Sequence, residues 1–208
     1  MKDRNFQKEM DRLIARLCEE GRVPTLLLHS CCAPCSSYVL EYLSQYFSIN
    51  VLYYNPNISK KGEYDLRIAE QQKLIDSMDF VNPVSFTAGE YDTHRFYELA
   101  KGLEKCEERG ERCHRCYRLR LEYTAEKAKQ MGADYFATTL TLSPLKDAKV
   151  LNAIGEELAK KYGVMYLASD FKKREGYKRS LELSKKYNLY RQSFCGCIYS
   201  QINNENKD

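Results

Sequence analysis

The residues in this chain with the greatest potential for chemistry are cysteines, and most of them lie in three short groups. Seven of the nine cysteines belong to these groups: Cys31, Cys32 and Cys35; Cys113 and Cys116; and Cys195 and Cys197. Adjacent cysteines and Cys-x-x-Cys spacings are typical of metal ligation and redox exchange, and nine cysteines in a reducing compartment argue against a disulfide scaffold. The sequence therefore predicts a metal or redox centre.

The first two groups have the spacing of metal ligands. Cys113 and Cys116 are expected at the start of a helix, where the helix N-terminus favours the thiolate forms that bind metals. Cys31 and Cys32 cannot both face one metal in a regular strand, but they can at a strand-to-helix turn, with Cys35 one turn further on. Four thiolates from two segments suit either tetrahedral zinc or an iron–sulfur cluster. The spacing does not separate these metals, although seven clustered cysteines exceed one zinc site.

The third group, Cys195-Gly196-Cys197, calls for a different chemistry. A Cys-x-Cys pair is too short for relaxed disulfide geometry, so it would form a strained, easily reduced bond or supply two further ligands. We interpret Cys195 and Cys197 as a redox-active pair. The alternative is that they only pack the C-terminal tail.

Strands and helices that alternate along the chain are expected to position these groups. Apolar runs predict strands over residues 25–29, 49–54, 81–86, 135–140 and 164–168. Helical periodicity predicts helices over residues 3–20, 37–46, 63–78, 92–103, 117–131, 147–162 and 175–187, with an irregular tail over 192–200. This alternation predicts an α/β fold: a Rossmann-like, doubly wound parallel sheet with helices on both faces.

A chain of 208 residues without an internal repeat or a flexible linker is expected to form a single domain. We expect an N-terminal helix within 1–22, a catalytic core over 23–200 and a frayed tail over 201–208. Ligands of open parallel sheets collect beyond the carboxyl ends of the strands. Besides the cysteines, this rim should carry the polar residues His29, Asn55, Asn57, Ser143 and Asp170.

Composition narrows the possible partners. No run of about 18 apolar residues could span a bilayer, and the N-terminus leads into a charged amphipathic helix, so a cytoplasmic protein without a membrane partner is expected. The net charge of +4, 17 tyrosines and the basic run 172–174 are compatible with RNA binding. No glycine-rich loop follows the first strand, which argues against ATP as a cofactor.

The cysteine groups belong to a set of short motifs that runs from about residue 25 to the C-terminus. These motifs are His29-x-Cys31-Cys32-Ala33-Pro34-Cys35, Tyr54-Asn55-Pro56-Asn57-Ile58, Glu63-Tyr64-x-x-Arg67, Arg112-Cys113-x-x-Cys116-Tyr117-x-x-Arg120-Leu121, Thr138-Thr139-Leu140-x-x-Ser143-Pro144, Asp170-Phe171-Lys172 and Cys195-Gly196-Cys197-Ile198. Together they resemble the QueH-type epoxyqueuosine reductases, which act in the last step of making the base queuosine in tRNA.

The resemblance implies a nucleotide-alpha-hydrolase-like fold in which cysteines replace the phosphate loop. It also implies a [4Fe-4S] cluster and no cobalamin. The implied cluster ligands are Cys31, Cys32, Cys113 and Cys116. A second, mononuclear iron beside the cluster is a further implication, and Cys35 occupies the turn where one of its ligands would lie.

The implied partner is a tRNA that carries epoxyqueuosine at the anticodon. The implied reaction turns the epoxide of this base into an alkene with two electrons and two protons, and it releases water. Electrons would arrive from an unidentified donor through the cluster, with Cys195 and Cys197 as a reservoir or relay. Candidate substrate-binding residues are Glu63, Tyr64 and Arg67, together with the polar residues of the rim. A surface ion pair between Glu63 and Arg67 is the alternative for that pair. The catalytic acid stays unassigned.

Two other functions compete with this prediction. An ATP-dependent tRNA sulfur transferase of the related fold would place cysteines near a cluster, but it needs a phosphate loop after the first strand. A non-catalytic, zinc-stabilised RNA-binding module would explain the Cys113-x-x-Cys116 pair and the basic charge. That module leaves Cys35, Cys195 and Cys197 without a role.

Overall fold

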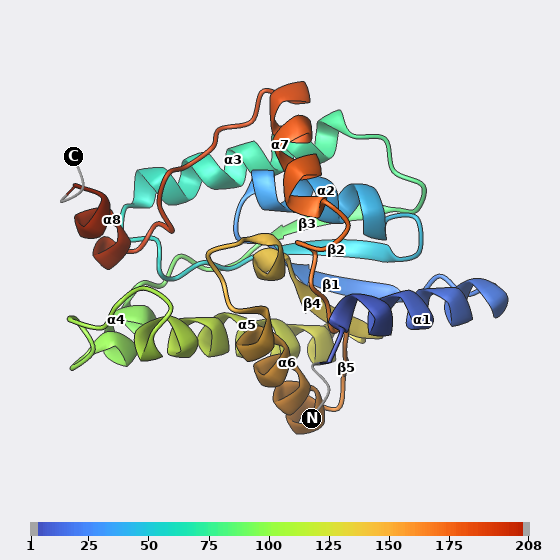
Figure 1. Cartoon of the computed structure of the whole chain (residues 1–208), viewed down its shortest axis with the longest axis horizontal. Coiled ribbons are helices and arrows are strands. Elements are labelled where there is room, and N and C mark those ends of the chain that lie inside the picture. The colour runs from blue at the N-terminus through green and yellow to red at the C-terminus, as the bar shows by residue number, and fades with distance from the viewer. Residues whose placement is uncertain (1–3, 206–208) are drawn as a thin grey trace.

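The computed structural model describes residues 4–205, with side chains up to Gln201. Its centre is a five-stranded, all-parallel sheet with the order β3-β2-β1-β4-β5 (Figure 1). The strands are β1 (Thr25–His29), β2 (Ser48–Tyr53), β3 (Val84–Ala88), β4 (Tyr135–Thr138) and β5 (Met165–Tyr166). The predicted parallel α/β sheet is confirmed, and its strand order reverses beside β1, where ligands of such sheets bind.

Helices cover both faces of the sheet (Figure 1). They are α1 (Phe6–Glu19), α2 (Ala33–Leu43), α3 (Lys61–Ser77), α4 (His94–Ala100), α5 (Glu111–Met131), α6 (Ala148–Tyr162), α7 (Gly176–Lys186) and α8 (Ile198–Glu205), with a 3₁₀ turn at Thr139–Leu142. Among the described helices, none combines the length and the apolar character needed to cross a bilayer.

Strand β1 shows why the sheet is buried on both faces. Leu26 and Leu28 belong to one core cluster, which includes residues of α1, α2 and α3, while Leu27 belongs to the cluster formed with α5 and α6. Side chains alternate between the faces of a strand, so a continuous apolar run serves both layers. The burial of this strand fixes the position of the turn that follows it.

Helices α2 and α5 begin a full turn or more before their predicted starts, and both differences place cysteines inside helices. Helix α2 begins at Ala33 because Cys32 is extended (φ −175°, ψ 159°) and Pro34 lies in the first turn, where proline is favoured. Helix α5 begins at Glu111, so that Cys113 and Cys116 lie in its first two turns. Residues before a run of helical periodicity can thus be helical themselves, because the helix begins where the extended backbone of Cys32 or Gly110 ends.

Other boundaries differ at the ends of elements. Helix α1 begins at Phe6, after the Asn5 side chain accepts a hydrogen bond from the Lys8 amide; the expected start at residue 3 lies outside the described residues. Strand β4 stops at Thr138, whose hydroxyl accepts a hydrogen bond from the Leu140 amide and turns the chain. The expected frayed tail from 201 is instead helical to Glu205, and residues 206–208 lie outside the described range.

Candidate metal and redox centre

The first cysteine group lies at the turn between β1 and α2, at the carboxyl end of the sheet. The Sγ atoms of Cys31 and Cys32 are 3.8 Å apart. All three Sγ atoms of Cys31, Cys32 and Cys35 lie within 4.8 Å of one another. Two thiolates on one tetrahedral ion with bonds of ~2.3 Å would lie about 3.8 Å apart. This donor set therefore suits a thiolate-bound metal.

The triad also concentrates negative charge on one sulfur. Hydrogen bonds from Cys32 and Cys35 hold the pKa of Cys31 well below its usual range, helped by the Arg120 guanidinium and the Thr139 hydroxyl. The hydrogen bond to Cys31 raises the pKa of Cys32 to about 12 and, likewise, raises that of Cys35. The Thr139 hydroxyl lies 3.2 Å from the Cys31 amide nitrogen and 3.4 Å from its Sγ. One thiolate is thus stabilised before any metal binds.

The second group, Cys113 and Cys116, faces a neighbouring small cavity. Burial raises the pKa of Cys113 and raises that of Cys116 to about 11. The Arg109 amide nitrogen lies 3.4 Å from the Cys113 Sγ and donates to it. The small cavity is lined by Asn57, Phe96, Arg112, Cys113, Cys116, Tyr117, Arg120, Lys146, Cys195 and Cys197. The second and third cysteine groups therefore share one space.

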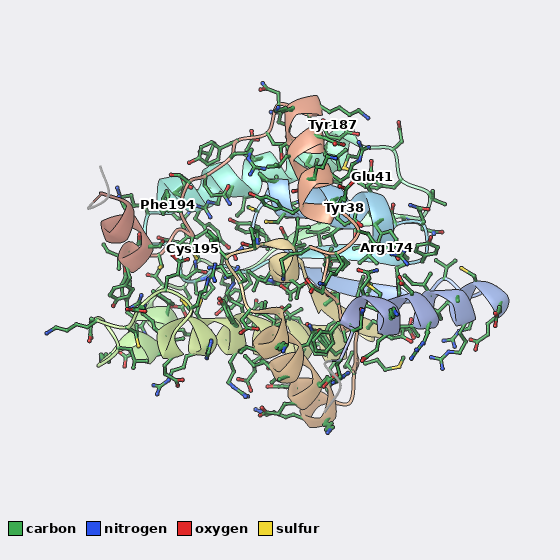
Figure 2. All side chains as sticks on the ribbon, in the orientation of Figure 1. Tyr38, Glu41, Arg174, Tyr187, Phe194 and Cys195 are labelled. Carbon is green, nitrogen blue, oxygen red and sulfur yellow. The ribbon has the colours of Figure 1, made fainter. Side chains whose placement is uncertain are left out.

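Residues from α3 and from the loop after β2 hold the third cysteine group (Figure 2 labels Phe194 and Cys195). Arg67 donates to the Cys195 carbonyl oxygen at 3.2 Å and to the Phe194 carbonyl oxygen at 3.4 Å. The Ser59 amide donates to the Gly196 carbonyl oxygen at 3.0 Å. The hydrogen bond between the two thiols lowers the pKa of Cys195 and raises that of Cys197. The second thiolate of the site is thus on Cys195.

A fully buried cation, Arg120, lies among these groups. Its side chain donates to the Asn55 Oδ1 atom and to the His29 Nε2 atom, the latter at 3.3 Å. No carboxylate in residues 4–201 pairs with it. Burial would lower the pKa of Arg120, but Cys116 and Cys195 oppose burial and the pKa is raised. A buried charge is costly unless it is compensated. The thiolates of Cys31 and Cys195 supply that compensation.

A larger cavity of about 410 Å³ opens over the cysteine triad. Its lining comprises Cys31, Cys32, Pro34, Cys35, Arg67, Glu108, Arg120, Leu140, Ser143, Pro144, Leu145, Lys146, Tyr177, Ser180, Arg191, Gln192, Ser193, Phe194, Cys195 and Ser200. Three residues, Arg120, Lys146 and Cys195, line both cavities. The structure therefore brings all three cysteine groups to one site at the carboxyl ends of the strands.

The predicted polar residues divide into those that reach this site and those that do not. Ser143 and Arg67 line the large cavity, and Asn57 lines the small one. His29 and Asn55 are 0% and 1% exposed, and both accept a hydrogen bond from the Arg120 side chain. For these two, the geometry opposes the predicted contact with substrate and favours a positioning role. Burial, together with Arg120, lowers the pKa of His29 to about 3, so its ring is neutral near pH 7.

Three further predicted residues are occupied by protein contacts. The Tyr64 hydroxyl donates to the Gly89 carbonyl oxygen at 2.9 Å, and the ring is buried. Glu63 pairs with Arg67 at 2.7 Å, in a mostly buried arrangement instead of the surface ion pair considered from sequence. Asp170 pairs with Lys172 at 2.9 Å and is not part of the cavity lining. These contacts also oppose direct substrate binding by Tyr64, Glu63 and Asp170.

Sequence reasoning missed two cations of the site, Arg120 and Lys146. The sequence could have predicted Arg120, because it follows Cys116 by four residues and therefore lies on the same face of α5. Lys146 comes from an irregular segment and gives no such signal. Its side chain is 9% exposed, and its Nζ atom lies 3.3 Å from Glu108.

Known proteins resemble this chain over most of its length. The profile of the family described as epoxyqueuosine reductase QueH matches residues 26–203. A Staphylococcus epidermidis protein named epoxyqueuosine reductase QueH is 43% identical over 95% of this chain and 85% of its own length. Proteins of the same name from Streptococcus pyogenes (40% identical; 94% of this chain, 78% of theirs) and Thermotoga maritima (33%; 88% and 93%) are also similar. The chain belongs to the epoxyqueuosine reductase QueH family.

Proposed function

We propose that the protein reduces epoxyqueuosine in tRNA to queuosine, in the cytoplasm and without cobalamin. The observation that carries this proposal is the convergence of seven cysteines on one site, in a chain whose relatives are named epoxyqueuosine reductases. The proposed metal group is a [4Fe-4S] cluster held by Cys31, Cys32, Cys113 and Cys116. When bound, such a cluster supplies electrons one at a time.

The donor set supports thiolate ligation near buried cations. Arg120 is oriented toward the sulfurs by Asn55 and His29, and Lys146 faces Cys195 from the other wall. These cations balance the charge of metal-bound thiolates without adding a competing ligand. The compact spacing of the triad also supports the proposed second, mononuclear iron, for which Cys35 is the candidate ligand.

The Cys195–Cys197 pair matches the reaction in its electron count. Conversion of the epoxide to the alkene breaks two C–O bonds, consumes two electrons and two protons, and releases one water. Oxidation of the Cys195 thiolate and the Cys197 thiol to a disulfide releases two electrons and one proton, and water supplies the second proton. We assign Cys195 and Cys197 this redox role, and an external electron donor must then reduce the pair again. Cys195 lines both cavities, which supports transfer of electrons from the pair to a substrate in the large cavity.

The two competing functions have less support. An ATP-dependent sulfur transferase would need a phosphate-binding loop after β1, where this chain has Cys31 and Cys32. A zinc-stabilised RNA-binding module would give no role to the Cys195–Cys197 pair, which shares a hydrogen bond beside three cations.

The test is anaerobic purification followed by absorption spectroscopy and iron, sulfide and zinc analysis. We expect an absorbance near ~400 nm that dithionite bleaches, with at least about four iron and about four sulfide per chain. Cys113→Ala should lose both the colour and the turnover of epoxyqueuosine tRNA. The matched control is Cys18→Ala, which changes an exposed cysteine on α1 outside the site.

Two results would contradict the proposal. Stoichiometric zinc without colour, even after iron–sulfide reconstitution, would identify the binding module. Full turnover by Cys113→Ala would show that the second cysteine group does not hold the metal.

A further inference from the structure

The size of the large cavity sets how much of an RNA substrate can enter it. Cavities of ~300–1,000 Å³ bury most of a ligand of drug size, and this one holds about 410 Å³. That volume admits one nucleoside and not a folded RNA loop. An enzyme that acts on one base therefore takes that nucleotide out of its stack, and the neighbouring nucleotides stay outside. The residues at the mouth must meet those neighbours.

Several cations line the large cavity, but most of them already interact with other groups of the protein. Four cations line it (Arg67, Arg120, Lys146 and Arg191), against a single lining carboxylate, Glu108. Arg67 pairs with Glu63 at 2.7 Å, and Lys146 pairs with Glu108 at 3.3 Å. Arg120 is enclosed among the thiols. Within the side chains that the structure describes, this leaves Arg191 as the lining cation available at the mouth.

Tyr177, at the start of α7, and Arg191, beyond the end of α7, both line the large cavity and are exposed to solvent. Arg191 is exposed, and its Nη1 atom donates to the Ser184 hydroxyl of α7 at 3.3 Å. No carboxylate of residues 4–201 lies within salt-bridge distance of it. Tyr177 is 39% exposed, and its ring has no aromatic or cationic partner among those residues. An exposed aromatic ring and a guanidinium without a carboxylate partner, both in the lining of one cavity, form a combination that recognises single-stranded RNA.

We propose that Tyr177 and Arg191 form a subsite for the nucleotide adjacent to the reacting one. Tyr177 stacks on its base, and Arg191 pairs with the adjoining phosphate. This inference rests on the proposed function, since it assumes an RNA substrate whose reacting base enters the cavity.

The test measures binding and turnover of an anticodon stem-loop RNA that carries epoxyqueuosine. Loss of one stacked base corresponds to a weakening of about 5- to 150-fold, which we expect for Tyr177→Ala. Tyr177→Phe keeps the ring and should bind within about twofold of the parent protein. Arg191→Gln should weaken binding and reduce the slope of log Kd against log salt by about 0.7, as expected for one phosphate contact with a single strand. In both loss variants KM should rise more than kcat falls.

Matched controls separate a specific subsite from general surface effects. Tyr97→Ala removes a tyrosine of nearly equal exposure, 38%, on α4 and away from the cavity. Arg16→Gln removes an exposed arginine on α1. The subsite would be overturned if Tyr177→Ala and Arg191→Gln bound the RNA as tightly as the parent protein and the two control variants do. Absence of epoxyqueuosine reduction by the parent protein would instead overturn the proposed function, and RNA affinities would still report on the subsite.

Discussion

Two regions of the molecule bring cysteines to the same site, but the protein holds them by different means. The Cys31–Cys35 turn is part of the sheet: the Ser30 amide donates to the Leu52 carbonyl oxygen at 2.9 Å, and α2 begins within the turn. The Phe194–Cys197 segment is irregular. It depends on contacts from residues far away in sequence, chiefly Arg67 and the Ser59 amide.

This difference separates two requirements of the proposed chemistry. A metal site needs ligands fixed by rigid elements, which a strand end and a helix start provide. A dithiol that cycles between thiols and a strained disulfide must change its backbone geometry, which a segment held by a few hydrogen bonds allows. The contrast predicts that substitutions in the two regions have separable effects on metal content and on turnover.

The largest expected effect comes from replacing one cysteine in each region. Cys31→Ser should reduce the iron content from at least about four per chain to below about one, because the cluster loses a fixed ligand. Cys195→Ser should keep the iron and the colour but lose turnover to background, because the redox pair is broken. Iron analysis and the epoxyqueuosine assay on both variants check this, with Cys18→Ser as the control. Equal iron loss in the two variants would make Cys195 a ligand and remove the contrast.

A smaller effect is expected at Arg120, which contacts both regions. Arg120→Gln removes the buried positive charge that faces Cys31, Cys116 and Cys195. Partners that orient and balance metal ligands contribute about 10- to 100-fold to metal affinity, and we expect a loss in this range. Arg120→Lys retains the charge and should lose less. Iron retention during dialysis against a chelator measures the effect, and retention by Arg120→Gln equal to that of the parent would contradict it.

The sequence predicts the first region well because its position depends on local patterns. The apolar run Leu26–Leu28 identifies β1, and the carboxyl ends of parallel strands share one edge, so the cysteines after β1 had to reach that edge. Helix starts were less predictable, since α2 and α5 begin after the extended residues Cys32 and Gly110, outside the apolar periodicity. The roles of individual site residues stay predictions.

The second region could not be placed from sequence, because tertiary contacts decide its position. The i and i+4 spacing indicated an ion pair between Glu63 and Arg67. It did not indicate that this pair is largely buried and that Arg67 binds the backbone of Phe194 and Cys195. The burial of Tyr64 likewise follows from its contact with the Gly89 carbonyl oxygen, and no periodicity encodes that contact.

The smallest effect should come from Gly196, the residue between the paired thiols. Its φ of +106° lies where side chains are strained, and an added Cβ would meet the Ile58 Cγ1 atom at 2.8 Å. Gly196→Ala should therefore cost about 1–2 kcal/mol locally, which detaches the segment and lowers turnover about 5- to 30-fold while iron content stays unchanged.

The rate at which an alkylating reagent modifies Cys195 measures this detachment, because a released segment exposes the thiol more often. The matched control is Gly62→Ala, since an added Cβ at this position in α3 has no neighbour within 4 Å. Alanine there should stabilise the helix by up to about 1 kcal/mol and leave turnover intact. The Gly196→Ala and Gly62→Ala variants could show the same rate of Cys195 alkylation and the same turnover. The segment would then tolerate a side chain and would not be held by the close contact with Ile58. If Gly196→Ala loses iron together with turnover, the segment supports the metal site directly, and the two regions act as one.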